Sequence, residues 1–254
     1  MTFPAAGMIF FDKPQGWTSH DAAEAFRRML PKGTKVGHCG TLDPLATGLL
    51  ILMVGPCTRF QARMQGLDKI YSGVIRLGVS TDTGDIAGHV LATQQVPALS
   101  LKELQEVLNA HTGTLQMPAP VFSAVKHQGK PLYKYARQGI AVPHKLRTST
   151  VYKWEGLSYS QPDLEHRLSC SSGTYVRSLA ELIGKKLGCG ATVYCLRRDR
   201  IADFSAQDAL TLEQIKGMSL QSLKDTLAQS LPRLGAAIAS GILQSGKPAA
   251  SSRI

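Results

Sequence analysis

The sequence predicts an α+β fold in which a mixed sheet is flanked by helices. Stretches with alternating apolar and polar residues, typical of strands, are interspersed with stretches whose apolar residues recur at helical spacing. Some predicted strands are joined by turns short enough for hairpins, which favours a mixed sheet. With 254 residues, of which 43% are apolar, the chain is long enough to bury a full core.

The N-terminal residues predict a strand, a turn and a helix, in that order. Residues 7–11 are typical of a short strand, and a turn follows over 12–16. Thr18 and Asp21 have the spacing of a capping box, which marks the start of a helix. Apolar residues recur at helical spacing before Pro31 ends it: Ala22, Ala23, Phe26, Met29 and Leu30.

Strands and helices continue to alternate along the rest of the chain. The predicted elements are strands over 71–79, 164–170 and 191–196, helices over 101–108 and 176–187, and one or two short amphipathic helices over 211–231. The strand over 191–196 leads to Arg197, Arg198 and Arg200. We expect the residues from about Ser240 to be frayed, because they are small, polar and basic.

The loop Gly37–Gly48, which runs into the apolar segment Leu49–Val54, is the strongest candidate for a functional site. Its glycines adopt backbone conformations that other residues resist, and Pro44 biases Asp43 towards an extended geometry. We therefore expect the loop to hold one carboxylate still beside a buried strand. The alternative is an ordinary turn, in which the Asp43 side chain binds local backbone N–H groups.

The charge balance indicates a polyanionic partner. Lys and Arg total 29 against 18 Asp and Glu, which gives a net charge of +11. Nucleic acid is a better candidate than an anionic membrane. We expect a soluble, cytoplasmic protein, because no apolar run approaches the roughly 20 residues that span a bilayer and no N-terminal leader is evident.

The sequence predicts neither metal nor nucleotide cofactor. The five cysteines are an odd number and form no C-x-x-C pair, which fits neither a disulfide framework nor a zinc site. The seven histidines are scattered, and none has a second ligand at metal-binding spacing. No G-x-G-x-x-G or P-loop pattern is present.

The region between Val107 and Trp154 is strongly basic and contains no Asp or Glu. It carries seven positive side chains: Lys126, Lys130, Lys134, Arg137, Lys145, Arg147 and Lys153. Aromatic residues, among them Tyr133 and Tyr135, lie between them. A solvated surface is the usual meaning of such a run, but the missing acids and the interleaved aromatics favour backbone contacts and stacking on a nucleic acid.

Arg177 lies in the first turn of the helix predicted over 176–187, away from its apolar stripe. A positive charge near a helix N-terminus is mildly disfavoured by the helix dipole, so we expect a partner carboxylate. Asp43 needs such a cation, because desolvation in a closed site raises the pKa of a carboxyl group and a guanidinium opposes that shift. A surface ion pair or a cap is the alternative for Arg177.

The chain resembles the TruB-type tRNA pseudouridine synthases. Residues 37–48 are similar to the family signature G-H-T-G-x-L-D-P-x-A-T-G. Further similar segments follow the family's order, namely D-K-P-x-G-x-T-S in 7–19, K-x-Y and T-D-T-x-D in 68–85, S-A-x-K and L-Y-x-x-A-R-x-G in 122–139, S-x-G-T-Y-[IV]-R in 172–177 and L-R-R in 196–198. So many motifs in one order over about 7–200 make a chance similarity very unlikely. Two departures are Cys39, where the family usually has Thr, and Phe122, where it often has Tyr.

The resemblance implies a pseudouridine-synthase-like catalytic domain that isomerises uridine to pseudouridine in the T-loop of tRNA, at the pseudouridine-55 position, without a cofactor. The uridine is flipped out of its stack. The glycosidic bond between the ribose and the uracil nitrogen then breaks, and the uracil reattaches to the ribose through carbon. Asp43 matches the family's essential carboxylate, and Arg177 matches its ion-pair partner. Tyr71 matches the tyrosine that stacks on the target base.

The resemblance also implies a set of substrate contacts. His38 matches a histidine that helps to extrude the base, and Tyr175 and Leu196 match residues that line the uracil pocket. Asp85 matches a polar pocket residue that organises the site or contacts the base. The sequence does not distinguish attack of Asp43 on the ribose, attack on the base, and support of a glycal route.

We expect a catalytic domain over 1–210, with an RNA-clamp insertion over 118–153, and a short helical extension and tail over 211–254. The clamp is expected to bind RNA through six of its basic side chains: Lys126, Lys130, Lys134, Arg137, Lys145 and Arg147. Family members commonly add a PUA domain, and we expect it to be absent here or present only as a remnant. We therefore expect a monomer that recognises the T-arm of tRNA through the catalytic domain.

Three alternatives stay open from the residues. A non-catalytic tRNA-binding or tRNA-folding module would need the basic region but not Asp43. A nucleosidase or glycosidase would need a second carboxylate as general acid, and only Asp82 and Asp85 lie in nearby motifs. A pseudouridine synthase acting on another RNA is the third.

Overall fold

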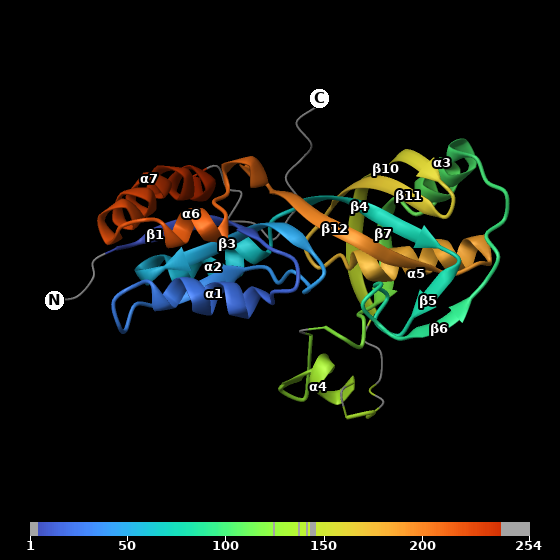
Figure 1. The fold of residues 1–254 in the computed structure, drawn as a ribbon, viewed down its shortest axis with the longest axis horizontal. Coiled ribbons are helices and arrows are strands. Elements are labelled where there is room, and N and C mark those ends of the chain that lie inside the picture. The colour runs from blue at the N-terminus through green and yellow to red at the C-terminus, as the bar shows by residue number, and fades with distance from the viewer. Residues whose placement is uncertain (1–4, 124, 137, 141, 143–145, 240–254) are drawn as a thin grey trace. The chain divides into compact units, whose positions relative to one another are not determined.

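The computed structural model describes residues 5–123, 125–136, 138–140, 142 and 146–239. The chain forms two compact units: unit 1 consists of residues 1–69 and 197–254, and unit 2 of residues 70–196. Strands and helices are mixed throughout, and most strand pairs are antiparallel, so the predicted α+β architecture is confirmed (Figure 1). No helix in the described ranges is long and apolar enough to cross a membrane.

Unit 1 is built around one buried strand. Its elements are β1 (Gly7–Lys13), α1 (Ser19–Arg28), β2 (Val36–Cys39), β3 (Thr47–Val54), the 3-10 helices η1 (Gly55–Phe60) and η2 (Ala206–Asp208), α2 (Gln61–Gln65), β13 (Phe204–Ser205), α6 (Leu212–Lys216) and α7 (Leu220–Ala239). β3 is buried from Gly48 onwards and pairs antiparallel with both β1 and β2. The predicted buried strand after the Asp43 loop is therefore confirmed.

Helices cover the strands of unit 1. α1 begins at the predicted capping box, in which Thr18 binds the backbone of Asp21 and Asp21 binds the backbone of Thr18. α7 packs against β1, where the Ser230 hydroxyl accepts a hydrogen bond from Met8 N–H at 2.6 Å. Over 211–231, α6 is a five-residue helix, as predicted, but α7 has 20 residues and continues through Pro232, so the prediction of a short helix is wrong there. Its buried residues Leu223, Leu227 and Leu234 supply the packing that offsets the proline.

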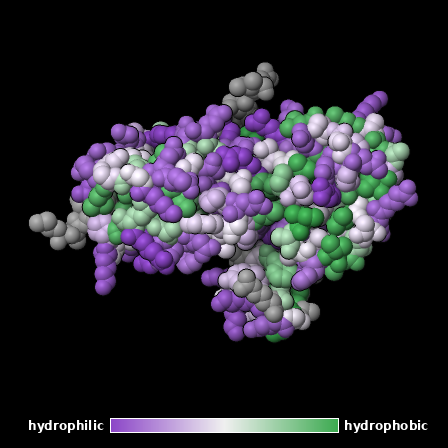
Figure 2. All heavy atoms as spheres, in the orientation of Figure 1, coloured by the Kyte–Doolittle hydropathy of each residue, from purple (hydrophilic) through white to green (hydrophobic). Residues whose placement is uncertain are grey.

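Unit 2 contains a sheet in the order β12–β4–β11–β10–β7. Its elements are β4 (Lys69–Leu77), β5 (Val79–Thr81), β6 (Val90–Thr93), α3 (Leu101–Asn109), β7 (Gly113–Pro118), β8 (Lys126–His127), β9 (Lys130–Pro131), α4 (Leu132–Ala136), β10 (Leu146–Ser160), β11 (Asp163–Cys170), α5 (Val176–Leu187) and β12 (Ala191–Ile201). Lys69 of β4 and residues 197–201 of β12 are counted in unit 1. α3 opens with the predicted capping box at Ser100 and packs on β10. The exposed large hydrophobic side chains lie mainly in this unit: Val90, Leu91, Ile140, Leu146, Tyr152, Leu157 and Tyr194 (Figure 2).

Two predicted strand boundaries are wrong. The strand over 71–79 ends at Leu77, because Gly78 adopts a φ of +84° and separates β4 from β5. β12 continues to Ile201, so Arg197 and Arg198 lie within it instead of after it. Both charges are compensated inside unit 1: Arg197 binds both carboxylate oxygens of Asp12, at 3.0 and 2.7 Å, and Arg198 binds backbone carbonyls. The tail from Ser240 lies outside the described residues.

Candidate active site

The predicted site residues are distributed over both units. Asp43 and His38 belong to unit 1, and Tyr71, Asp85, Tyr175, Arg177 and Leu196 belong to unit 2. The role of each residue and the pairing of Asp43 with Arg177 stay predictions. The local contacts of each residue show what the fold does with it.

Asp43 lies in the connection between β2 and β3, which is bound from several sides. The buried Ser19 hydroxyl accepts a hydrogen bond from Leu42 N–H at 2.8 Å and donates one to Leu42 O at 3.2 Å. Gly16 N–H donates to Pro44 O at 2.8 Å. Backbone groups on both sides of Asp43 are thus tied to the start of α1 and the turn before it, as expected for a loop that holds one carboxylate still.

Lys13 lies beneath the same loop, and its ammonium group donates to three carbonyl oxygens. Nζ is 2.6 Å from Trp17 O, 2.9 Å from Pro14 O and 3.5 Å from Pro44 O. The side chain is fully buried, and this burial lowers the Lys13 pKa to about 8. The negative charge of Asp43 opposes the shift, while Arg198 adds to it. Lys13 therefore places a positive charge near Asp43 that is present below about pH 8.

His38 is half-buried and lies on β2, directly after Gly37, the first glycine of the loop. Burial, followed by the nearby charge of Arg198, lowers its pKa, so the ring is uncharged at neutral pH. Its Nδ1 is buried, and none of the described residues gives that atom a hydrogen-bond partner. Gln65 Nε2, from α2, donates to His38 O at 3.4 Å. An uncharged ring suits contact with a base better than contact with a phosphate.

Cys39 is fully buried in the core of unit 1. Burial raises the pKa of its thiol to about 12. The thiol is thus inert at neutral pH and packs as a small apolar group. The difference from the family's usual Thr leaves the Asp43 carboxylate as the chemical group of the loop.

Arg177 is only 4% exposed, so the alternative of a surface ion pair is wrong. It lies in the first turn of α5, after the N-cap residue Tyr175. Nη1 donates to Thr83 O at 2.8 Å, and Nη2 donates to Phe122 O at 2.9 Å. These carbonyls hold the guanidinium in one orientation. The Phe122 contact uses only the backbone, so the absence of a hydroxyl at this position does not affect it.

Asp85 is buried, and its side chain forms hydrogen bonds within the turn to which it belongs. Its Oδ1 accepts hydrogen bonds from the Thr83 hydroxyl at 2.8 Å and from Ala87 N–H at 3.2 Å. The turn is attached to β12, because Val193 N–H donates to Gly84 O at 3.0 Å. These contacts show Asp85 organising the turn that supplies the Thr83 carbonyl to Arg177. Contact of Asp85 with a base stays a prediction.

Tyr71 and Leu196 lie on neighbouring strands of unit 2, β4 and β12, and each is 8% exposed. Gly73, two residues from Tyr71 on the same face, lets the strands approach closely: a Cβ there would lie 2.3 Å from Cys195 O and 3.1 Å from Leu196 Cα. Tyr175 is half-buried at the start of α5. The pocket role of these three side chains stays a prediction.

Part of the basic region forms a hairpin and the short helix α4. β8 and β9 form a hairpin whose turn residues Gln128 and Gly129 have positive φ angles. The Tyr135 hydroxyl of α4 donates to His127 O at 3.1 Å. The predicted RNA-binding residues Lys126, Lys130, Lys134 and Arg147 are exposed, while Arg137 and Lys145 lie outside the described residues. Arg147 belongs to β10, so the end of the predicted 118–153 insertion is part of the sheet.

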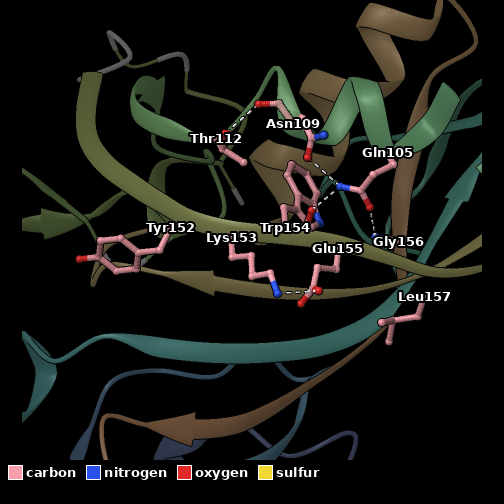
Figure 3. Close-up of a pocket in the computed structure, with 9 residues that line it drawn as sticks. All are labelled: Gln105, Asn109, Thr112, Tyr152, Lys153, Trp154, Glu155, Gly156 and Leu157. Atoms are coloured by element: carbon pink, nitrogen blue, oxygen red, sulfur yellow. Dashed lines mark hydrogen bonds and ion pairs between the residues drawn. The ribbon is translucent and has the colours of Figure 1, made fainter. Parts of the chain in front are cut away.

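A pocket of about 450 Å³ lies at the junction of α3 and β10 in unit 2 (Figure 3). It contains none of the predicted site residues. The Gln105 amide donates to Trp154 O and accepts from Gly156 N–H, both at 2.8 Å, and Lys153 pairs with Glu155 at 2.7 Å. The two Gln105 hydrogen bonds attach α3 to β10, whereas Lys153 and Glu155 both lie on β10. We therefore regard the pocket as a packing feature.

Sequence reasoning missed the residues that hold the Asp43 loop. Ser19, Lys13 and Arg198 all fall in segments that resemble family motifs, but their roles depend on contacts with distant backbone carbonyls. The only local signal was the presence of charged residues inside otherwise apolar strands. Among the described residues, no group of three or more His, Cys, Asp or Glu side chains is placed to hold a metal ion.

Most of the chain matches known families of one kind. Residues 27–176 match the N-terminal domain of the TruB family pseudouridylate synthases, and residues 177–237 match the tRNA pseudouridylate synthase B C-terminal domain. A protein from Azoarcus sp. (strain BH72) named tRNA pseudouridine synthase B is 41% identical over 244 residues, which cover 96% of this chain and 80% of that protein. The protein of the same name from Dechloromonas aromatica (strain RCB) is 43% identical, over 90% of this chain and 78% of that protein.

Solved structures have a similar fold. A chain in the crystal structure of a Cbf5-Nop10-Gar1 complex is 29% identical and superposes with a TM-score of 0.64, over 82% of this chain and 52% of that one. A chain in the structure of an H/ACA RNP bound to a substrate RNA containing 2'-deoxyuridine is 25% identical, with a TM-score of 0.62, over 86% of this chain and 57% of that one. This chain thus spans a little over half the length of those two.

Proposed function

The chain belongs to the TruB family of pseudouridylate synthases, and we propose that it isomerises uridine to pseudouridine in tRNA, at the pseudouridine-55 position of the T-loop. The observation that carries this proposal is the family match over residues 27–237, within which the Asp43 loop lies. The hydrogen bonds that fix that loop and the buried guanidinium of Arg177 support it. The basic surface of unit 2 fits an RNA substrate.

The reaction rearranges one glycosidic bond and needs no net oxidation or reduction. The bond from C1′ to N1 of uracil breaks, and a bond from C1′ to C5 forms. The C5 proton is lost and N1 gains a proton, so substrate and product have the same composition. The protein must therefore flip the uridine, hold the detached uracil while it turns, and move a proton.

We assign these tasks as follows. Asp43 is the essential carboxylate, and Arg177 keeps it ionised. Tyr71 and Leu196 contact the faces of the base, and Tyr175 lines the same pocket. His38, with its uncharged ring, takes part in extruding the uridine, and Asp85 fixes the turn next to Arg177. A rigid Asp43 loop supports this assignment, because a catalytic group that is already in place adds little reorganisation to the barrier.

We assign RNA binding to the exposed basic residues of the region 118–153. We propose that the part of the tRNA they recognise is the T-arm. Lys126, Lys130 and Lys134 lie on a hairpin and a short helix that carry no acidic residue. Such a surface contacts phosphates rather than a base sequence. The protein is expected to act as a monomer.

The direct test uses the purified chain with an unmodified tRNA transcript. Pseudouridine is mapped at nucleotide resolution, and we expect it at the single T-loop position. A T-arm hairpin is assayed in parallel and should be nearly as good a substrate as whole tRNA. Release of free uracil would indicate a nucleosidase, and tRNA binding without any product would indicate a non-catalytic module. A strong preference for whole tRNA would contradict recognition through the T-arm alone.

A further inference from the structure

Arg198 carries a buried positive charge that none of the proposed chemical steps uses. Its side chain is 1% exposed and lies in unit 1, near the end of β12. The guanidinium donates three hydrogen bonds, all to backbone carbonyls: Nε to Leu49 O at 2.8 Å, Nη2 to Gly40 O at 3.1 Å and Nη1 to Thr41 O at 3.4 Å. Burial of a charge is costly unless such partners compensate it.

The three carbonyls lie on both sides of Asp43 along the chain. Gly40 and Thr41 precede it, and Leu49 follows it on β3. A guanidinium is planar and rigid, so one Arg side chain fixes both segments relative to each other. The loop between them then has little freedom to move its carboxylate.

The backbone of Arg198 holds the same loop from its other end. β12 runs parallel to β3 here, with Arg197 opposite Thr47 and Arg198 opposite Gly48. A Cβ at Gly48 would lie 2.4 Å from Arg198 O, so the strands approach more closely than any other residue would allow. Side chain and main chain of one residue therefore contact the loop before Asp43 and the strand after it.

We infer that Arg198 is the positioning residue for the Asp43 carboxylate. The inference rests on the proposed function, in which that carboxylate is essential. Arg198 itself is assigned no contact with the RNA, because its donors are bound to carbonyls inside the protein. A lysine at this position keeps the charge, but its single ammonium cannot reproduce the planar fork that spans the two segments.

The test separates the rate of the chemical step from tRNA binding and from folding. Pseudouridine formation is followed in single turnovers with excess enzyme, and the dissociation constant for unmodified tRNA is measured separately. We expect the single-turnover rate constant to fall about 100-fold in Arg198→Met and about 10-fold in Arg198→Lys, as for a misplaced catalytic group. The dissociation constant should stay within about threefold of wild type, since phosphate contacts are unchanged.

Arg197→Gln is the matched control, because the residue is of the same type, adjacent on β12, and bound to Asp12 instead of the loop. It should keep the wild-type rate constant. The rate constant is taken at saturating enzyme, where partial unfolding lowers only the concentration of active enzyme and leaves the rate constant of the folded fraction unchanged. Arg198→Lys serves if Arg198→Met does not fold. A wild-type rate constant in the folded Arg198 variants, or an equal loss in Arg197→Gln, overturns the inference. If wild type itself forms no pseudouridine, the proposed function fails first.

Discussion

Gly48 shows how tightly the structure encloses the strand that follows Asp43. Its φ is +98°, and a Cβ would lie 2.4 Å from Arg198 O. We predict that Gly48→Ala destabilises the protein by about 2–4 kcal/mol, because backbone strain and a backbone clash add. Gly16→Ala is the control: it has a similar φ of +84° but open space around it. Urea unfolding should show a clearly smaller loss for Gly16→Ala, and equal losses would contradict the role of the close approach.

His166 gives unit 2 a pH-dependent stability. The side chain is fully buried, Trp154 Nε1 donates to its Nδ1 at 3.2 Å, and burial lowers its pKa to about 4. The unfolded chain binds a proton at this residue below about pH 6.5, whereas the folded protein does so only near pH 4, so stability falls as pH falls between these values.

The expected loss of unfolding free energy from this residue is about 2 kcal/mol between pH 6.5 and pH 5. Urea unfolding of wild type and His166→Gln at several pH values measures it. The variant is less stable at pH 7, but its stability should depend less on pH over this interval. A variant with the same pH dependence as wild type would show that the buried imidazole is not the cause.

Asp43 could be predicted from the sequence, and the residues that hold it could not. The loop is indicated by a local pattern, namely glycines and a proline within a few positions of the carboxylate. Arg198 acts on carbonyls that lie 149 to 158 positions away in the chain. No local pattern records which of several arginines at a strand end is buried. Lys13 presents the same difficulty, since its partners are backbone oxygens of any residue type.

Elements with strong local signals were predicted correctly, as the two capping boxes before α1 and α3 show. The 15-residue strand β10 was not predicted, although it is the longest strand of unit 2. Its pairing with β11 shifts register between Val151 and Lys153 and again between Gly156 and Ser158. Each such irregularity displaces the inward and outward positions by one residue, so the alternation that identifies a strand is lost.

Gln105 attaches α3 to β10 by two hydrogen bonds to the β10 backbone. Its amide binds the backbone of Trp154 and Gly156, beyond the part of β10 that pairs with β7 (Figure 3). Gln105→Ala leaves these partly buried groups without their partners, and we predict a loss of about 1–3 kcal/mol in unfolding free energy. Lys102→Ala, at an exposed position of the same helix, should change it little. Similar effects of both changes in urea unfolding would contradict this role.

For the protein as a whole, the charge balance indicated the class of partner and the ordered motifs indicated the family. The net charge of +11 is a property of composition, and it favours nucleic acid without naming one. Motifs in six segments that follow the family's order are far more specific, and the family match over residues 27–237 agrees with them. The motifs could not predict the contacts of Asp43, Arg198 and Arg177, because these contacts depend on the folded backbone.

The most direct measurement of the central claim compares wild type with Asp43→Asn on unmodified tRNA. The substitution removes the negative charge and almost nothing else, so folding and the basic surface are retained. Single-turnover assays should show pseudouridine at the T-loop position with wild type and none with Asp43→Asn, while both bind tRNA with similar dissociation constants. Pseudouridine formation at a near-normal rate by Asp43→Asn would contradict the account.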